Sequence, residues 1–307
     1  MKTKVFFLLI VSFLINSGCV EDYDVTLGST ISYFYYQEYN RNVVVGEGLR
    51  VKPGVMLSGL IVNDEERSVN FEVDPSLIFD DTKTLLPDDY YTLGSNSEIK
   101  IPAGEFQGYL NVELDSLKFL ADPKSLTGEY VLPIRLTGTN NVDSVNPGKN
   151  YIVMSVSYWA KQHGNYYYNG QTIRKQGVNT IDTLKYQYDK SNNNSVRELL
   201  TTGPTTLSML PDPVSSGQDP ARGKFTLHLD IPTYGGGVIS LTGDPDSNIA
   251  VSPDGDSSYD EETKTFYLNY RYNDGTYDCF ANDTLVFRNR VRDMQSDGQG
   301  VNEWRGF

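Results

Sequence analysis

The strongest constraint on the fold of this chain is a hydrophobic pattern that repeats every two residues. Along residues 69–74, 110–115 and 152–158, apolar side chains recur at every second position. Successive side chains of a strand point to opposite faces of a sheet, so the pattern predicts half-buried antiparallel strands. Turn sequences such as Lys52-Pro53-Gly54 separate them at short intervals. We therefore predict an all-β protein whose first domain, over residues 30–158, is a β-sandwich.

A second β-rich region is expected over residues 164–307. Alternating patterns occur around 184–188, 225–231, 266–272 and 285–287, with little helical periodicity between them. About eight short strands in succession are typical of an up-and-down antiparallel barrel or of a second sandwich. The segment from Trp159 to Gly164 is expected to mark the domain boundary, with Trp159 packing between the two domains.

Three segments depart from the strand pattern. Residues 115–126 are compatible with a helical turn, which Pro123 limits in length. Ser195 and Glu198 fit a helix capping box, although a strand is equally compatible with the residues that follow. Four prolines between Gly203 and Gly223 predict a long loop.

The first residues of the chain have the order of parts found in secretory signals. Lys2 and Lys4 precede an apolar run over residues 5–15. That run is shorter than the roughly 20 residues needed to span a bilayer. Ser17-Gly18 leads into Cys19, which indicates a lipoprotein whose signal peptide covers residues 1–18 and whose Cys19 carries the lipid. Residues 19–29 are then a tether, and the attachment to the membrane is lipid rather than helix.

The charge of the chain limits its partners. It has 26 basic and 40 acidic residues, a formal net charge of −14. Such a surface repels phosphate backbones, which argues against nucleic acid as a partner. The same argument favours a neutral ligand over a polyanionic one, although local patches can differ from the net charge.

Few residues are suited to catalysis. The chain has two histidines, His163 and His228, and if Cys19 is acylated Cys279 is a lone thiol, which we interpret as a small buried hydrophobe. A zinc site or a nucleophile relay built on histidine is therefore not expected, and no known catalytic or nucleotide-binding motif is present. The acidic pairs lie beside turn residues, where carboxylates are usually solvated. We predict no catalytic residues, no metal and no cofactor.

The acidic stretch over residues 244–262 leaves one alternative open. Asp254-Gly255-Asp256 resembles the start of a calcium loop, and carboxylate oxygens suit calcium. An EF-hand is excluded because Tyr259 and Thr265 stand where that loop requires glycine and glutamate. A less regular calcium loop and a solvated hairpin tip both remain compatible with the sequence.

Three aromatic residues stand outside the strand alternation and are candidate ligand contacts. Tyr234 precedes a run of three glycines, Tyr259 lies in the acidic stretch, and Trp304 lies near the end of the chain. Aromatic residues in exposed loops often serve recognition. Trp304 is equally suited to sealing an open end of the second domain.

Several segments resemble a known family. Pro87-Asp88-Asp89-Tyr90-Tyr91-Thr92-Leu93, residues 99–105 and residues 129–137 resemble an N-terminal domain of unknown function in Bacteroidota lipoproteins, which is an immunoglobulin-like sandwich. Residues 164–307, with Gly203-Pro204 and 259–270, are similar to the lipocalin-like antiparallel β-barrel that accompanies it. The lipoprotein signal departs from the family pattern at Asn16, where leucine is usual.

The resemblance implies a function. Members of this family are cell-surface or periplasmic lipoproteins encoded near SusC/SusD-type glycan-uptake systems, and they are suspected of binding glycans. The Asp-x-x-Asp-x-Asp-x-Glu signature of enzymatic relatives is absent here, so the enzyme activity does not carry over. Glu21-Asp22 resembles the signal that sends such lipoproteins to the outer face of the outer membrane. The alternative is a structural or adhesion lipoprotein that contacts a protein partner or the cell envelope.

Overall fold

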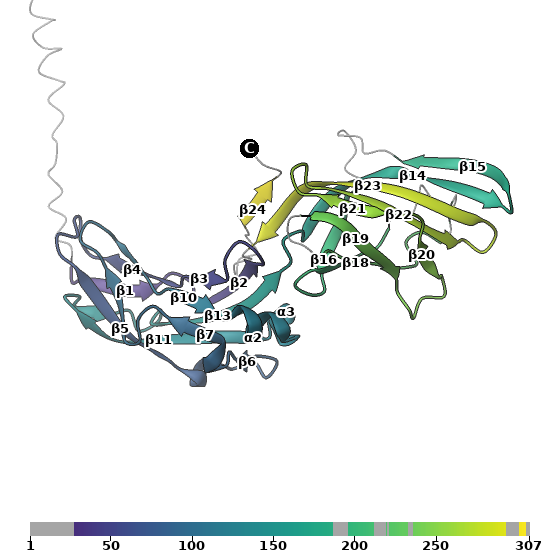
Figure 1. Cartoon of the computed structure of the whole chain (residues 1–307). Coiled ribbons are helices and arrows are strands. Elements are labelled where there is room, and N and C mark those ends of the chain that lie inside the picture. Colours follow the sequence, from purple (N-terminus) through teal and green to yellow (C-terminus); the bar gives the residue numbers. More distant parts are fainter. Residues whose placement is uncertain are drawn as a thin grey trace, which may run out of the picture.

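The computed structural model describes residues 28–186, 196–211, 219, 221–232, 236–292 and 301–304. These residues form two β-rich domains that are joined end to end through residues 160–163 (Figure 1). The all-β prediction is confirmed. Among the described residues, no helix has the length and apolar character needed to cross a membrane.

The first domain is a β-sandwich, as predicted. Its strands are β1 (Ile31–Phe34), β2 (Glu38–Val44), β3 (Arg50–Val51), β4 (Gly54–Ser58), β5 (Arg67–Val73), β6 (Thr84–Leu85), β7 (Tyr91–Leu93), β8 (Glu98–Ile101), β9 (Gln107–Tyr109), β10 (Val112–Leu114), β11 (Tyr130–Asn140), β12 (Ser144–Val145) and β13 (Tyr151–Trp159). One sheet has the order β2-β13-β11-β5-β8, with β6 beside β11, and the others have the orders β12-β1-β4-β9 and β3-β10-β7. Phe34, Val112, Ile134 and Met154 come from all three sheets and belong to one buried cluster, so the core lies between the layers.

Short helices connect some of these strands. Two α-helices, α2 (Ser116–Ala121) and α3 (Lys124–Thr127), flank Pro123, and two 3₁₀-helices are η1 (Pro75–Leu77) and η2 (Asp88–Tyr90). The Asp115 carboxylate caps α2 by accepting hydrogen bonds from the backbone N–H groups of Leu117 at 2.9 Å and Lys118 at 3.0 Å. The helical turn predicted for this segment is confirmed, and α2 ends before the proline, as expected.

The second domain is an antiparallel sheet that curls back on itself. Its strands are β14 (Gly164–Gln176), β15 (Asn179–Tyr186), β16 (Val196–Thr201), β17 (Thr206–Met209), β18 (Leu227–Asp230), β19 (Gly236–Gly243), β20 (Val251–Pro253), β21 (Ser257–Asp260), β22 (Thr265–Asn273), β23 (Asp278–Arg292) and β24 (Val301–Trp304). One edge of β14 pairs with β15 and β16, and its other edge pairs with β23 from Asn165 to Lys175. The strands β14-β16-β17-β18-β19-β21-β22-β23 therefore form a closed circuit, and of the two predicted alternatives the barrel is the one observed.

The structure corrects two local predictions in this domain and settles a third. The proline-rich segment 203–223 is not a continuous loop, because it contains β17, whose Leu207 and Met209 are buried. The final strand was expected to span 285–287, yet β23 runs from Asp278 to Arg292 and β24 follows it. Residues 196–201 form a strand rather than a helical turn, since Leu199 packs into the core.

A polar network fills part of the interior of the second domain. The side chains of Arg222 and Asp283 are both fully buried, and Arg222 Nη2 lies 3.0 Å from Asp283 Oδ2. The same carboxylate accepts hydrogen bonds from the hydroxyls of Tyr168, Tyr186 and, at 2.6 Å, Tyr270. The positive charge of Arg222 and the negative charge of Asp283 compensate each other, because a buried charge is costly unless it is paired. The domain therefore uses its own side chains to occupy this part of its interior.

Removing one member of this buried pair is expected to be costly. The substitution Arg222→Met leaves the Asp283 carboxylate buried without its cationic partner, which lowers the free energy of unfolding by about 3–5 kcal/mol. Urea denaturation measures the effect. The matched control is Arg50→Met, whose partner Glu113 is 62% exposed and whose own side chain is 67% exposed. Equal losses in the two variants would contradict the importance of the buried pair.

The junction between the domains is held by aromatic and polar contacts. The ring of Trp159 stacks on that of His163 with centroids 4.0 Å apart. His163 Nδ1 accepts a hydrogen bond from the backbone N–H of Thr201 at 3.2 Å. Arg290 of the second domain lies 2.9 Å from Glu47 of the first. Trp159 thus packs at the junction, as the sequence suggested.

This junction makes stability depend on pH. Burial, together with the positive charge of Arg290, lowers the pKa of His163 from 6.5 to about 4. Between pH 6.5 and pH 4, the imidazole of His163 binds a proton in the unfolded chain more readily than in the folded chain. The free energy of unfolding is therefore highest above pH 6.5 and falls as the pH falls towards 4. We expect His163→Gln to lose less stability than the wild type between pH 7.5 and pH 4.5, by up to about 3 kcal/mol. Urea unfolding at both pH values measures this, and His228→Gln is the control. An unchanged pH dependence in His163→Gln would refute the role of this ring.

Candidate functional site

Exposed tyrosines gather on the outer surface of the first domain beside β1. Tyr35, immediately after this strand, is 57% exposed, and Tyr109 on β9 is 53% exposed. The Tyr109 ring lies across Gly54 of β4, where an added Cβ would come within 2.9 Å of the ring. Glycine therefore leaves the space in which this ring lies flat against the sheet. A hollow of about 350 Å³ is lined by Tyr35, Gly54, Val55, Met56, Gln107 and Tyr109, and we call it the tyrosine platform.

A line of rings leads from this platform to the other sheet. The rings of Tyr35 and Tyr36 meet edge to face with centroids 4.5 Å apart. Tyr36 stacks on Tyr39 of β2, with centroids 6.3 Å apart and planes inclined by 9°. Tyr39 in turn lines a second hollow on the six-stranded layer. Aromatic surface therefore continues around the edge of the sandwich from one sheet to the other.

The second hollow combines apolar and polar groups. Its volume is about 320 Å³, within the usual range for small-molecule sites. It is lined by Glu38, Tyr39 and Asn40 of β2, residues 77–80 and Lys83, Val131 of β11, and Tyr151, Val153 and Ser155 of β13, and we call it the β2 hollow. Phe79, one of the residues that line the hollow, is 81% exposed. Carboxylate, amide and hydroxyl groups beside aromatic rings suit a ligand that is rich in hydroxyls.

The charged groups of the β2 hollow are partly committed to the protein. The Asp80 carboxylate accepts hydrogen bonds from the hydroxyl and the backbone N–H of Thr82, and these bonds lower the pKa of Asp80. The Lys83 ammonium donates to the carbonyl of Gly128 at 2.9 Å. These two residues shape the loop around the hollow, so the exposed Glu38 and Asn40 are better placed for contacts with a ligand.

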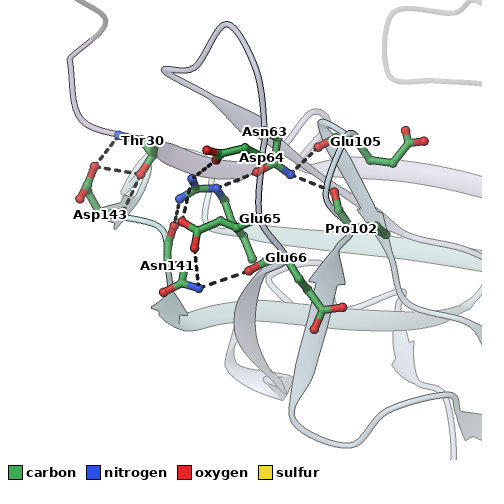
Figure 2. Close-up of polar contacts among 10 residues, drawn as sticks. Thr30, Asn63, Asp64, Glu65, Glu66, Pro102, Glu105, Asn141 and Asp143 are labelled. Atoms are coloured by element: carbon green, nitrogen blue, oxygen red, sulfur yellow. Dashed lines mark hydrogen bonds and ion pairs between the residues drawn. The ribbon is translucent and has the colours of Figure 1, made fainter.

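An acidic cluster at one end of the sandwich has a structural role (Figure 2). Its members are Asp64, Glu65, Glu66 and Asp143. The Arg67 guanidinium lies among its acceptors, with Nε 2.8 Å from Asn63 Oδ1 and Nη2 3.0 Å from Glu65 Oε1. Beside it, the Asp143 carboxylate accepts hydrogen bonds from the backbone N–H and the hydroxyl of Thr30, at 2.6 and 2.8 Å. The protein's own arginine thus balances these acids, and Asp143 holds the entry of the chain into the domain.

The structure corrects the prediction for Tyr259. This residue was expected in an exposed loop, but it lies on β21, opposite Gly237 of β19 and Phe266 of β22. It is 6% exposed, and its ring centroid is 4.4 Å from that of Phe266. Tyr259 is a core residue because strands pair on both sides of it, while Asp256 precedes the strand and Glu261 and Glu262 lie on the turn that follows.

The other predicted site residues are not brought together by the structure. Cys19 and Tyr234 lie outside the described residues. The backbone of Trp304 belongs to β24 and pairs with Asn289 of β23. Cys279 is fully buried, and burial raises its pKa to about 12, which confirms the interpretation as a small buried hydrophobe.

Two of the acids of residues 244–262 cap turns. Asp244 accepts a hydrogen bond from the backbone N–H of Asp246 at 2.9 Å, and Asp260 accepts from that of Glu262 at 2.9 Å. Within the described part of the chain, the residues whose potential ligand atoms converge lie elsewhere; they are Asp219, Asp274 and Cys279. Asp219 there already accepts a hydrogen bond from the Tyr272 hydroxyl. The acidic stretch is not a single hairpin tip, because it contains β20 and β21, and Glu261 lies 2.7 Å from the ammonium of Lys161.

The tyrosines of the platform were missed by sequence reasoning, although a signal was present. Four of the seven residues from Tyr33 to Tyr39 are tyrosines, the densest such segment of the chain apart from Tyr166-Tyr167-Tyr168. Alternation alone attributes such rings to half-buried strand faces. The density of tyrosine, which continues past the end of β1, is what could have drawn attention to this segment.

Comparisons with known proteins agree with this fold. Residues 27–143 match a family model described as an N-terminal domain. A Bacteroides ovatus structure of unknown function is similar over 90% of this chain and 99% of its own, with a TM-score of 0.70 and 23% identity. A second B. ovatus structure of unknown function covers 89% of this chain and 100% of its own, with a TM-score of 0.43 and 14% identity. None of the curated proteins matches the chain.

One further solved structure has a functional name. It is called an auxiliary nutrient binding protein, from Bacteroides thetaiotaomicron VPI-5482. It is similar over 85% of this chain and 92% of its own, with a TM-score of 0.43 and 14% identity.

The exposure of the platform can be tested by chemical modification. We expect tetranitromethane to nitrate Tyr35 and Tyr109 early, because their rings reach solvent. Tyr166, Tyr168 and Tyr270 should react last, since burial raises their pKa values and blocks the reagent. Peptide mass spectrometry over time identifies the modified residues. Nitration of the buried tyrosines as early as Tyr35 would contradict the described exposure.

Proposed function

We propose that this protein is a lipid-anchored lipoprotein of the cell surface that binds glycan, without catalysing a reaction, for a polysaccharide-uptake system. The observation that carries the proposal is the tyrosine platform, on which Tyr35 and Tyr109 are 57% and 53% exposed on a rigid sheet. Exposed rings that line one hollow together, unlike rings exposed singly, are typical of a recognition surface. Two such rings side by side suit the C–H faces of sugar rings.

Polar groups beside the rings provide the second half of sugar recognition. Gln107 lines the platform, and Glu38, Asn40 and Ser155 line the β2 hollow. Their amide, carboxylate and hydroxyl groups match the alternating donors and acceptors of sugar hydroxyls. Because both hollows are open and the rings between them are continuous, a chain of sugar units suits this surface better than a single sugar.

The chemistry of the remaining residues supports binding rather than catalysis. The Cys279 thiol is protonated at neutral pH because burial raises its pKa to about 12. His163 stacks on Trp159 at the domain junction, away from both hollows. The groups that line the hollows are those of a binding surface, and we assign no reaction to the chain.

The location and partners in this proposal come from the beginning of the chain and from the family resemblance. Cys19 would carry the lipid, and the Thr30–Asp143 contact holds the first domain at the end of the tether. SusC/SusD-type outer-membrane proteins are the expected partners, and a lipocalin-like second domain would accompany the binding domain. The name of the auxiliary nutrient binding protein describes that protein alone and is compatible with this role.

The proposal is tested with single substitutions on the platform. We expect Tyr35→Ala and Tyr109→Ala each to weaken binding of a glycan selected from a polysaccharide panel by about three- to tenfold, because each removes one stacking ring. Isothermal titration calorimetry measures the affinity. Tyr267→Ala, at a tyrosine that is 44% exposed on the second domain, should leave it unchanged.

Two outcomes would count against the proposal. Absence of binding to every host and plant glycan in the panel would refute glycan capture. Capture of a specific envelope protein that depends on Tyr35 and Tyr109, with no sugar binding, would favour the structural or adhesion lipoprotein instead.

A further inference from the structure

Lys149 places a positive charge beside the tyrosine platform. Its ammonium lies 5.5 Å from the ring centroid of Tyr33 and 6.0 Å from that of Tyr35. Both rings belong to the segment that borders the platform, and Tyr35 is one of its lining residues. An ammonium near the faces of two aromatic rings is attracted to them and is therefore held near this surface.

The backbone fixes the position of this lysine. The carbonyl of Lys149 accepts a hydrogen bond from the N–H of Phe34 at 2.9 Å, which ties it to the end of β1. Its own N–H donates to the carbonyl of Asn146 at 3.0 Å and closes the turn that contains Pro147 and Gly148. The charge is thus positioned by the same strand that positions Tyr33 and Tyr35.

Lys149 differs in its partners from three other lysines of the first domain. Lys100, Lys118 and Lys124 form ion pairs with carboxylates at 2.9, 2.8 and 2.7 Å. Within the described residues, the ammonium of Lys149 has no such carboxylate partner within 4.0 Å. Its charge is available to a ligand that lies on the platform.

We infer that the platform prefers a glycan with an anionic sugar unit, whose uronate carboxylate or sulfate ester pairs with Lys149 while a sugar ring stacks on Tyr35. This inference rests on the proposed function and adds the class of ligand to it. It departs from the expectation of a neutral ligand that the net charge suggests. Because exposed charges are screened beyond about 8 Å at physiological salt, the nearby lysine outweighs distant acids.

The test compares ligands that differ only in charge. Oligogalacturonate and its methyl ester have the same sugar rings, and calorimetry at about 0.15 M salt, where distant acids are screened, should show about two- to fivefold tighter binding of the acid. High salt and the substitution Lys149→Met should each abolish this preference while leaving the ester unaffected. Lys185→Met, at an exposed lysine of β15, is the matched control and should retain the preference. A sulfated oligosaccharide and its desulfated form, measured in parallel, distinguish a sulfate ester from a carboxylate.

The outcomes separate this inference from the proposed function. Equal affinities for the charged and neutral members of both pairs, with loss of binding in Tyr35→Ala, would overturn the anionic preference and leave glycan binding in place. A preference that survives Lys149→Met would also overturn it. Absence of binding to these ligands and to the whole glycan panel would overturn both proposals.

Discussion

The burial of Phe34 is the constraint on which the candidate site depends. Phe34 is fully buried and lies in one row with Val55 of β4 and Gly108 of β9. An added Cβ at Gly108 would lie 2.3 Å from the carbonyl oxygen of Lys100, so this row is held tightly against the opposite layer. Since side chains alternate along a strand, burial of Phe34 sends Tyr33 to the outer face. A shift of the strand register by one residue would turn the buried side chains outward and the exposed side chains inward. Burial of Phe34 in the core therefore determines the position of the platform.

Local patterns predicted the features that depend on neighbouring residues. Alternation predicted β5, β10 and β13, and Pro123 predicted the end of a helical turn, because both effects act within a few residues. Alternation did not predict that β13 pairs in parallel with β2, since the prediction was of antiparallel strands. Such patterns could not predict which strands pair when they are far apart in the sequence. The extent of β23 is set by β14, more than one hundred residues earlier in the chain, and by β22 on its other edge. The four residues of β17 were hidden among prolines because Leu207 and Met209 are too few to establish a period.

The candidate site shows the same limit. Tyr259 was expected to be exposed because acidic residues surround it in sequence, yet pairing with Gly237 and Phe266 places it in the core. Tyr35 and Tyr109 are far apart in sequence and meet only because β4 lies between β1 and β9. The exposure of a side chain depends on the whole sheet. The alternation pattern of a single strand therefore could not distinguish these rings from the buried tyrosines.

Both domains bury a paired arginine, Arg67 in the first and Arg222 in the second, but the exposed rings that line one hollow, Tyr35 and Tyr109, lie on the first domain. This location is why we propose the first domain as the binding surface. In the second domain, Arg222 and Asp283 satisfy one another in the interior, together with several tyrosine hydroxyls. Such a network stabilises one packing but leaves few donors or acceptors for a ligand. In the first domain the rings of Tyr35 and Tyr109 lie on the surface, and under the proposed function each of their contacts with a sugar would be weak and rapidly reversible. A polymer that meets several such rings in succession is retained by their number, since one bound unit keeps the next unit at high local concentration. A surface of this kind holds a long chain while still allowing it to be passed on.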